Sequence, residues 1–396
     1  MKSIVEKYGG RYLRTLDDLT VIAKHVAAGH ERGDRRVIVV AALQEIAQAM
    51  SQRAAQLGGQ ISKSHLDQMF SAAEQQTAAL MAAALEKEGL AAEVVPYIRG
   101  RALDMVDRAE GKHQLKTGRV TDVLDEGKVA VVAGFQGIGT YDQEDVKGRY
   151  GAAATAVAIA AALDCCCQLY GNTQGIYTRQ GGRVIKEISY EEAMELILLG
   201  ENDLESRAIE LASAFGVKLY VGPAFEAEQN GGTYIMDRSF IVQEGAVTGL
   251  AVSDDIVVYT LKGLPAVGGE IAELFELLGD LDVNIDMISQ QTCSENSCAV
   301  SFSCGREKIA DIDQAFASNQ RLRDLEIYRQ DDLSLVSVVG AGMASHTGVA
   351  SKVFSVLASK GVRHYNITTS EISISAAIDS GQKGTAVVAL SEAFQL

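Results

Sequence analysis

The chain has 396 residues and a formal net charge of -16 at pH 7, with 36 Lys and Arg against 52 Asp and Glu. A chain of this length forms two or three domains rather than one small module. The excess of acidic groups would repel a phosphate backbone, which argues against a nucleic-acid partner. No stretch approaches the roughly 20 consecutive apolar residues that cross a bilayer, and the first residues carry no secretion signal. We therefore expect a soluble, cytoplasmic protein without a membrane partner.

Residues 1 to about 240 alternate short β-branched runs with longer alanine-rich stretches, which is typical of a mostly parallel sheet covered by helices. The predicted strands are Ser3–Lys7, Arg36–Ala41, Ala92–Tyr97, Lys128–Phe135 and Val217–Val221. Apolar positions at helical spacing predict helices over Leu16–Ala28, Leu66–Lys87, Ala152–Leu163 and Tyr190–Leu199. The consecutive cysteines at 165–167 predict a further buried strand and no metal site, because neighbouring residues of one strand cannot jointly hold a tetrahedral metal.

Beyond residue 250 the sequence repeats itself at a shift of 79 residues. The matched positions pair Gly263 with Gly342, Gly269 with Gly348, Phe275 with Phe354, Leu278 with Leu357, Val283 with Val362 and Ile288 with Ile367. Each copy predicts a strand (Val257–Leu261, Val336–Gly340), a helix (Gly269–Gly279, Gly348–Lys360), a second strand (Asn284–Gln290, His364–Ser370) and one more strand. The expected domains are therefore 1–240, 250–330 and 331–396.

Motifs in both halves of the chain resemble those of the aspartokinase family. The first half contains Lys7-Tyr8-Gly9-Gly10 (family K-F-G-G), residues 132–137 (V-A-G-F-Q-G) and residues 188–192 (I-S-Y-x-E). The second half contains similar segments at 283–288, 339–343, 369–372 and 393–396. The resemblance implies an α/β fold: an amino-acid-kinase-like, mostly parallel sheet sandwiched by helices, followed by two ferredoxin-like ACT modules. It also implies transfer of the ATP γ-phosphoryl group to aspartate, which consists mainly of positioning and charge neutralisation.

Three charged residues match the family. Lys7 stands where relatives have their first phosphate-contacting lysine, and Arg149 matches the arginine that holds the substrate α-carboxylate. Glu74 matches the glutamate that meets the substrate amino group. A guanidinium suits a carboxylate and a carboxylate suits an ammonium, so Glu74 and Arg149 are candidate holders of a small amino acid such as aspartate. The alternative is that both are relics, bonded to each other or to solvent.

Seven positions in the expected phosphate pocket depart from the family: Arg11, Tyr12, Ala41, Ala153, Asn172, Gln174 and Asn202. Arg11 and Tyr12 replace Thr-Ser, Ala41 replaces a serine, and Ala153 replaces the aspartate of G-R-G-G-S-D-T-T. Asn172 and Gln174 replace two aspartates, and Asn202 replaces a second lysine among acidic residues that include Glu205. A methyl group cannot orient a lysine, and each uncompensated like-charge contact would cost about 1 to 4 kcal/mol.

These losses lead to the first hypothesis, a protein that has lost phosphoryl transfer, needs no cofactor, and acts by binding an amino acid or regulating a partner enzyme. The second hypothesis is an active aspartate kinase that uses Mg-ATP, with Lys7 and Arg11 supplying the positive charge. The third is a new reaction in the same amino-acid pocket, with Tyr12 or Tyr150 as acid–base groups. The histidines show no metal-ligand spacing, so no metal site is expected.

The second half carries candidate effector residues. Asn284, Met287, Ile288 and Gln290 match a strand that meets amino-acid effectors in the family, whereas Ala266 and Arg363 depart from its pattern. The alternative is that the modules serve only to form dimers. The resemblance implies a homodimer through the ACT modules, or a mixed assembly with a competent kinase.

Overall fold

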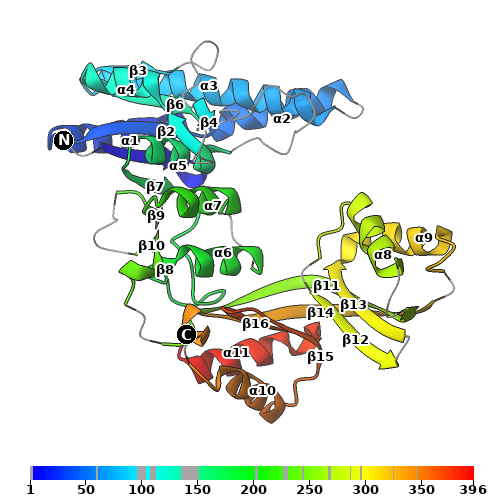
Figure 1. Cartoon of the computed structure of the whole chain (residues 1–396). Helices are drawn as coiled ribbons and strands as arrows, with labels where there is room; N and C mark the ends of the chain where they lie inside the picture. The colour runs from blue at the N-terminus through cyan, green and yellow to red at the C-terminus, as the bar shows by residue number, and fades with distance from the viewer. Residues whose placement is uncertain are drawn as a thin grey trace. The chain divides into compact units, whose positions relative to one another are not determined.

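The computed structural model describes residues 3–58, 61–95, 104–107, 113–134, 151–200, 204–225, 231–242, 245–265, 269–285, 287–294, 297–323, 325–344 and 346–396. The chain forms two compact units (Figure 1). The first unit comprises Met1–Tyr177, Val184–Met194 and Asn202–Val242, and the second comprises Thr178–Arg183, Glu195–Glu201 and Gln243–Leu396. Among the described residues, no helix is both long and apolar enough to cross a bilayer.

The first unit is built on an eight-stranded sheet with the order β3-β6-β2-β1-β7-β9-β10-β8. Its strands are β1 (Ser3–Tyr8), β2 (Arg35–Val40), β3 (Ala92–Val94), β6 (Val129–Ala133), β7 (Cys166–Tyr170), β8 (Glu187–Ser189), β9 (Leu219–Gly222) and β10 (Thr233–Met236). All neighbours run parallel except β9 and β10, which pair antiparallel. The near-continuous apolar sequences of β2 and β6 fit strands that are covered on both faces.

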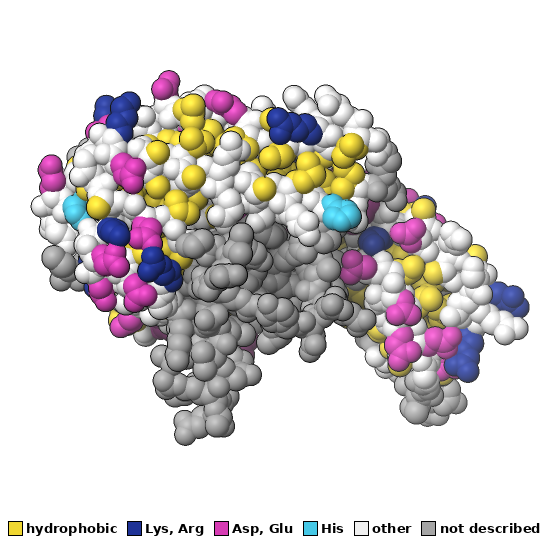
Figure 2. All heavy atoms as spheres, turned by 90° about the horizontal axis from the view of Figure 1, so that it is seen from above, with side chains coloured by type: hydrophobic (Ala, Val, Ile, Leu, Met, Phe, Trp, Pro, Cys, Tyr) yellow, Lys and Arg dark blue, Asp and Glu magenta, His cyan; other side chains and the backbone are white. Residues whose placement is uncertain are grey.

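Helices cover this sheet. They are α1 (Leu16–His30), α2 (Gln44–Leu57), α3 (Lys63–Lys87), α4 (Gly118–Asp125), α5 (Ala152–Ala162), α6 (Tyr190–Leu198) and α7 (Ser206–Phe215), and a small ribbon is formed by β4 (Asp104–Asp107) and β5 (His113–Lys116). α1 and α3 share one core with alternate residues of β1, β2 and β6, including Tyr8. α5, which is apolar all round, packs on β1, β7 and α7. Figure 2 looks onto the α2–α3 layer, where hydrophobic side chains lie among charged ones, and Leu57 and Phe70 are exposed on these helices.

The second unit is a six-stranded antiparallel sheet with the order β12-β13-β11-β14-β16-β15. Its elements are β11 (Gly249–Pro265), α8 (Glu270–Asp280), β12 (Ile288–Ser294), β13 (Ser297–Gly305), α9 (Ile309–Ser318), β14 (Glu326–Val339), α10 (Val349–Ser359), β15 (His364–Thr369), β16 (Ser373–Asp379) and α11 (Lys383–Phe394). The repeat is present, but each copy ends in a helix, α9 or α11, that the sequence analysis did not predict. β12 also begins at Ile288 rather than at Asn284.

β11 and β14 are longer than predicted because each continues through an aspartate pair. The segment 249–253 of β11 pairs with 335–339 of β14, and 256–262 pairs with 326–333. Asp255 and Asp332 lie between these segments with φ of 57° and 58°, a conformation that aspartate adopts more readily than most residues. Leu250 therefore joins the core of α10 and α11, whereas Tyr259 joins the core of α8 and α9. The boundary that we expected between the two modules, at residues 330 and 331, falls within β14. This division into modules stays a prediction.

Candidate active site

The site lies where parallel strands of the first unit end at one edge of the sheet. From β1 the chain turns to β2 on one side, while β7 lies on the other side of β1. The crevice outside the carboxyl ends of strands at such a reversal is where open α/β sheets bind ligands. Two short segments meet there, 9–12 after β1 and 171–175 after β7. The Gly9 N–H donates to the Tyr170 carbonyl at 3.1 Å and ties the two together.

Lys7 brings a positive charge to this edge. It lies on β1, on the face opposite Tyr8, and its ammonium lies over the backbone of Gly9. A Cβ atom on Gly9 would approach Lys7 Nζ to 2.8 Å and Ala41 Cβ to 3.6 Å, so the glycine and the small alanine both leave room for the ammonium. Burial lowers the pKa of Lys7, while the carboxylates of Glu205 and Glu74 act in the opposite direction. The structure thus brings together Lys7 and Glu74, two residues selected from the sequence.

The N-terminus of α5 lies at the same edge. Ala152 lies so close to Gly134 that a Cβ atom added to Gly134 would overlap the side chain of Ala152. The Gly134 N–H donates to the Val40 carbonyl at 2.8 Å. The first N–H groups of a helix lack intrahelical partners and favour anions. Here the Glu205 carboxylate accepts a hydrogen bond from the Ala154 N–H at 3.3 Å. Sequence analysis counted Glu205 only as an added negative charge and missed this contact.

Arg11 joins three of the positions that depart from the family. Its backbone N–H donates to Asn172 Oδ1 at 2.9 Å, and its Nη2 donates to the Tyr12 hydroxyl at 3.1 Å. When the Gln174 amide is oriented with its oxygen toward Arg11, that oxygen accepts hydrogen bonds from Arg11 Nη1 at 2.6 Å and from Arg11 Nη2 at 3.2 Å. The Tyr12 hydroxyl also accepts from the Ala224 N–H at 2.7 Å. In the described part of the chain, the guanidinium is therefore hydrogen-bonded to neutral side chains, which leave its charge available to an anion.

Other predicted residues lie elsewhere. Arg149, Tyr150, Asn202 and Ala266 lie outside the described residues. In the second unit, Asn284 is exposed in the loop before β12, and Ile288 and Gln290 are exposed on β12 itself, an edge strand. Met287 is buried, and its N–H donates to Ser303 Oγ at 3.0 Å. Its backbone donor is thus already used within the module.

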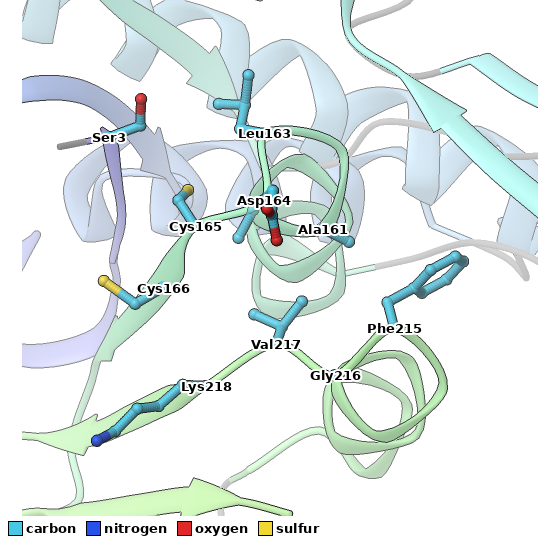
Figure 3. A pocket seen from close by; sticks show the side chains of 11 residues that line it. Ser3, Ala161, Leu163, Asp164, Cys165, Cys166, Phe215, Gly216, Val217 and Lys218 are labelled. Atoms are coloured by element: carbon cyan, nitrogen blue, oxygen red, sulfur yellow. The ribbon is translucent and has the colours of Figure 1, made fainter. Parts of the chain in front are cut away.

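A cavity of about 460 Å³ lies at the opposite, amino ends of β1, β7 and β9. Figure 3 shows Cys165 just before β7 and Cys166 at its start, with Lys218 just before β9 and Phe215 at the end of α7. Burial raises the pKa of Cys165 to about 12, so its thiol is protonated at neutral pH and is a poor nucleophile. The cavity also holds Asp164 and Lys218, but it lies at the end of the strands opposite to Lys7. No group of three or more His, Cys, Asp or Glu within the described ranges could hold a metal ion.

The chain is similar to known proteins over its full length. A model of the amino acid kinase family matches residues 2–223, and an ACT domain model matches residues 336–394. The chain is 33% identical over 403 residues to an aspartokinase of Geobacillus stearothermophilus, covering 100% of this chain and 98% of the relative. It is 32% identical over 409 residues to aspartokinase 2 of Bacillus subtilis (strain 168), with the same coverage.

Solved structures confirm the predicted fold. The crystal structure of Clostridium acetobutylicum aspartate kinase aligns with a TM-score of 0.75 at 17% identity, covering 99% of this chain and 100% of that one. The structure of E. coli aspartokinase III in complex with aspartate and ADP aligns with a TM-score of 0.72 at 18% identity, covering 100% of both chains. These two alignments concern the fold alone.

The first hypothesis, a protein that has lost phosphoryl transfer, is wrong, because curated relatives 32 to 33% identical over the whole chain are aspartokinases. The physical error was to count each altered position separately. Asn172 and Gln174 replace aspartates, but both contact the introduced Arg11, whose charge carboxylates would have neutralised. Ala153 lacks a carboxylate, but that of Glu205 lies at the same helix N-terminus.

Proposed function

Because the chain belongs to the aspartokinase family, we propose that it transfers the γ-phosphoryl group of ATP to the side-chain carboxylate of L-aspartate. The observation that carries this proposal is the position of Lys7, whose ammonium lies at the carboxyl ends of the strands and interacts electrostatically with Glu205, which is hydrogen-bonded to the first turn of α5. Phosphoryl transfer requires positioned groups that neutralise the charge of the migrating group. A half-buried ammonium at this edge of the sheet meets that requirement.

Arg11 adds a second cation, which we assign to the nucleotide phosphates. Its guanidinium is held by Gln174 and Tyr12, so little side-chain entropy is lost when a phosphate binds. We assign Glu74 to the amino group of aspartate and Arg149 to its α-carboxylate. Mg²⁺ would arrive with ATP, since it commonly binds through substrate phosphates, one or two carboxylates and waters. Bound Mg²⁺ would neutralise phosphate charge.

The test is formation of aspartyl hydroxamate by the purified full-length chain with Mg-ATP, L-aspartate and hydroxylamine. We expect ATP-dependent turnover of about 1 s⁻¹ or more, the ordinary range of kinases. Reactions without aspartate, and reactions with glutamate in its place, serve as controls. No turnover by a folded protein that also fails to bind Mg-ATP in calorimetry would contradict the proposal.

We further propose that the second unit binds an amino-acid effector and forms a homodimer. Asn284, Ile288 and Gln290 are exposed in or just before β12, an edge strand whose backbone is open to a partner on one side. Ile288 is 56% exposed, a large apolar side chain that a second copy would cover. Light scattering checks the dimer, and a thermal-shift series with lysine and threonine checks the effector. A monomeric mass at all protein concentrations would exclude the dimer.

A further inference from the structure

Glu205 is anchored at two ends. Its backbone is the N-cap of α7, where its carbonyl accepts from the Ala208 N–H at 3.0 Å. Its side chain reaches α5, where Oε2 accepts from the Ala154 N–H. The carboxylate also lies against Gly151, the N-cap of α5, so closely that a Cβ atom on Gly151 would overlap it. Only glycine leaves space for this carboxylate at the start of α5.

The neighbourhood of Lys7 is set by the same elements. α5 packs on β1, and its first residue Ala152 contacts Gly134, which is bonded to Val40 of β2. The next residue, Ala41, faces the Gly9 position over which the Lys7 ammonium lies. Among the described residues, the charged or titratable groups that act on Lys7 are Glu205 on the α7 cap, Glu74 on α3 and Cys167 on β7, in that order. Ala153 is buried in the first turn of α5 and presents only a methyl group there.

We propose that Glu205 is the positioning residue for Lys7: its carboxylate, fixed by the Ala154 N–H and the space over Gly151, orients the ammonium toward the transferring phosphoryl group. The inference rests on the proposed kinase function. A carboxylate supplied from α7 thus does the work that Ala153 cannot do from α5. The competing view is that Glu205 merely fills a phosphate position and must leave when ATP binds. That view predicts the opposite kinetic effect.

The experiment compares Glu205→Gln with Glu210→Gln in the full chain. Glu210 lies exposed on α7 and pairs with Arg207, away from Lys7, so it is a matched control. For Glu205→Gln we expect kcat to fall about ten- to a hundredfold, with the KM for aspartate within about twofold of the parent. We also expect the basic limb of the kcat profile to move to lower pH, because the variant removes a carboxylate that favours the charged lysine.

A second variant and a second readout separate this inference from the function. Ala153→Asp placed in the Glu205→Gln background returns a carboxylate to the first turn of α5, and we expect it to recover part of the lost kcat. The pH dependence of acetic-anhydride labelling at Lys7, read by mass spectrometry, reports the lysine without turnover. An inactive parent would overturn the function alone. Two results would overturn the positioning role. One is a Glu205→Gln enzyme whose kcat, labelling profile and basic pH limb are unchanged, and the other is a Glu205→Gln enzyme with full kcat and a lower KM for Mg-ATP.

Discussion

At the scale of single residues, we expect the half-buried ammonium of Lys7 to set the basic limit of the reaction's pH range. Burial lowers its pKa from the ordinary value of 10.5. The charged form is therefore lost as the pH rises through a value below 10.5, and kcat should fall on the basic side before an ordinary lysine would titrate. We expect Lys7→Met to reduce kcat by at least about a hundredfold, as does loss of one donor to transition-state charge. Circular dichroism checks the fold, and a basic limb at or above 10.5 would contradict the lowered pKa.

Arg11 makes a different kinetic prediction. Because its guanidinium is half-exposed and faces neutral groups, it should contribute to phosphate binding more than to the chemical step. Arg11→Gln is expected to raise the KM for Mg-ATP about three- to tenfold, with the KM for aspartate unchanged. Arg32→Gln is the matched control, because Arg32 is exposed just before the amino end of β2. Equal KM values in both variants would remove Arg11 from the nucleotide site.

Sequence reasoning identified single residues of the site but not their contacts. Lys7 and Glu74 were found by their match to family motifs, and the structure brings their charges together. Arg11 and Gln174 touch only because β1 and β7 are neighbours in the sheet, and strand order cannot be read from motif spacing. The carboxylate of Glu205 reaches α5 only because α5 and α7 pack together. Substitutions that each seemed to remove a functional group independently are therefore residues that contact one another in the structure.

At the scale of elements, the start of α5 depends on one glycine. Gly151→Ala places a methyl group on the Glu205 carboxylate, which must then move away from the Ala154 N–H. We expect a loss of kcat similar to that of Glu205→Gln, with the helix retained because the φ of -67° and ψ of 178° at this N-cap are accessible to alanine. Gly118→Ala is the control, because Gly118 opens α4 with no atom near a Cβ position. A Gly151→Ala enzyme as active as the Gly118→Ala enzyme would show that this space is unimportant.

Elements with strong periodicity were predicted, and those with mixed signals were not. β1, β2, α1, α3 and α5 lie within a few residues of their expected ranges. α2, α4, α7, α9 and α11 were missed, and the N-caps of four of them, Leu43, Glu205, Lys308 and Gln382, are residue types that do not mark a helix start in sequence. The aspartate pairs in β11 and β14 are typical of turns, but the positive φ of Asp255 and Asp332 lets each strand continue. Pairing along the whole strand outweighs that local preference.

At the scale of the whole molecule, the two units should unfold as two events. Each has its own core, and the halves of the second unit share β11 and β14. We expect two calorimetric transitions. Leu250→Ala and Phe302→Ala, in the two cores of the second unit, should both lower the same transition by about 5 °C or more. Val131→Ala in β6 should lower the other transition. Separate shifts for Leu250→Ala and Phe302→Ala would mean that the halves unfold independently.

The interlaced long strands also limit how this protein can be divided or recombined. A cut at any point between β11 and β14 places these two paired strands on separate fragments, although each half of the sheet contains a segment of both strands. A chimaera that exchanges one module with a relative would therefore have to splice inside a paired strand and match its partner's register. Exchange of both modules together avoids that mismatch. The two modules together, rather than either one alone, are therefore the natural unit of inheritance and of engineering.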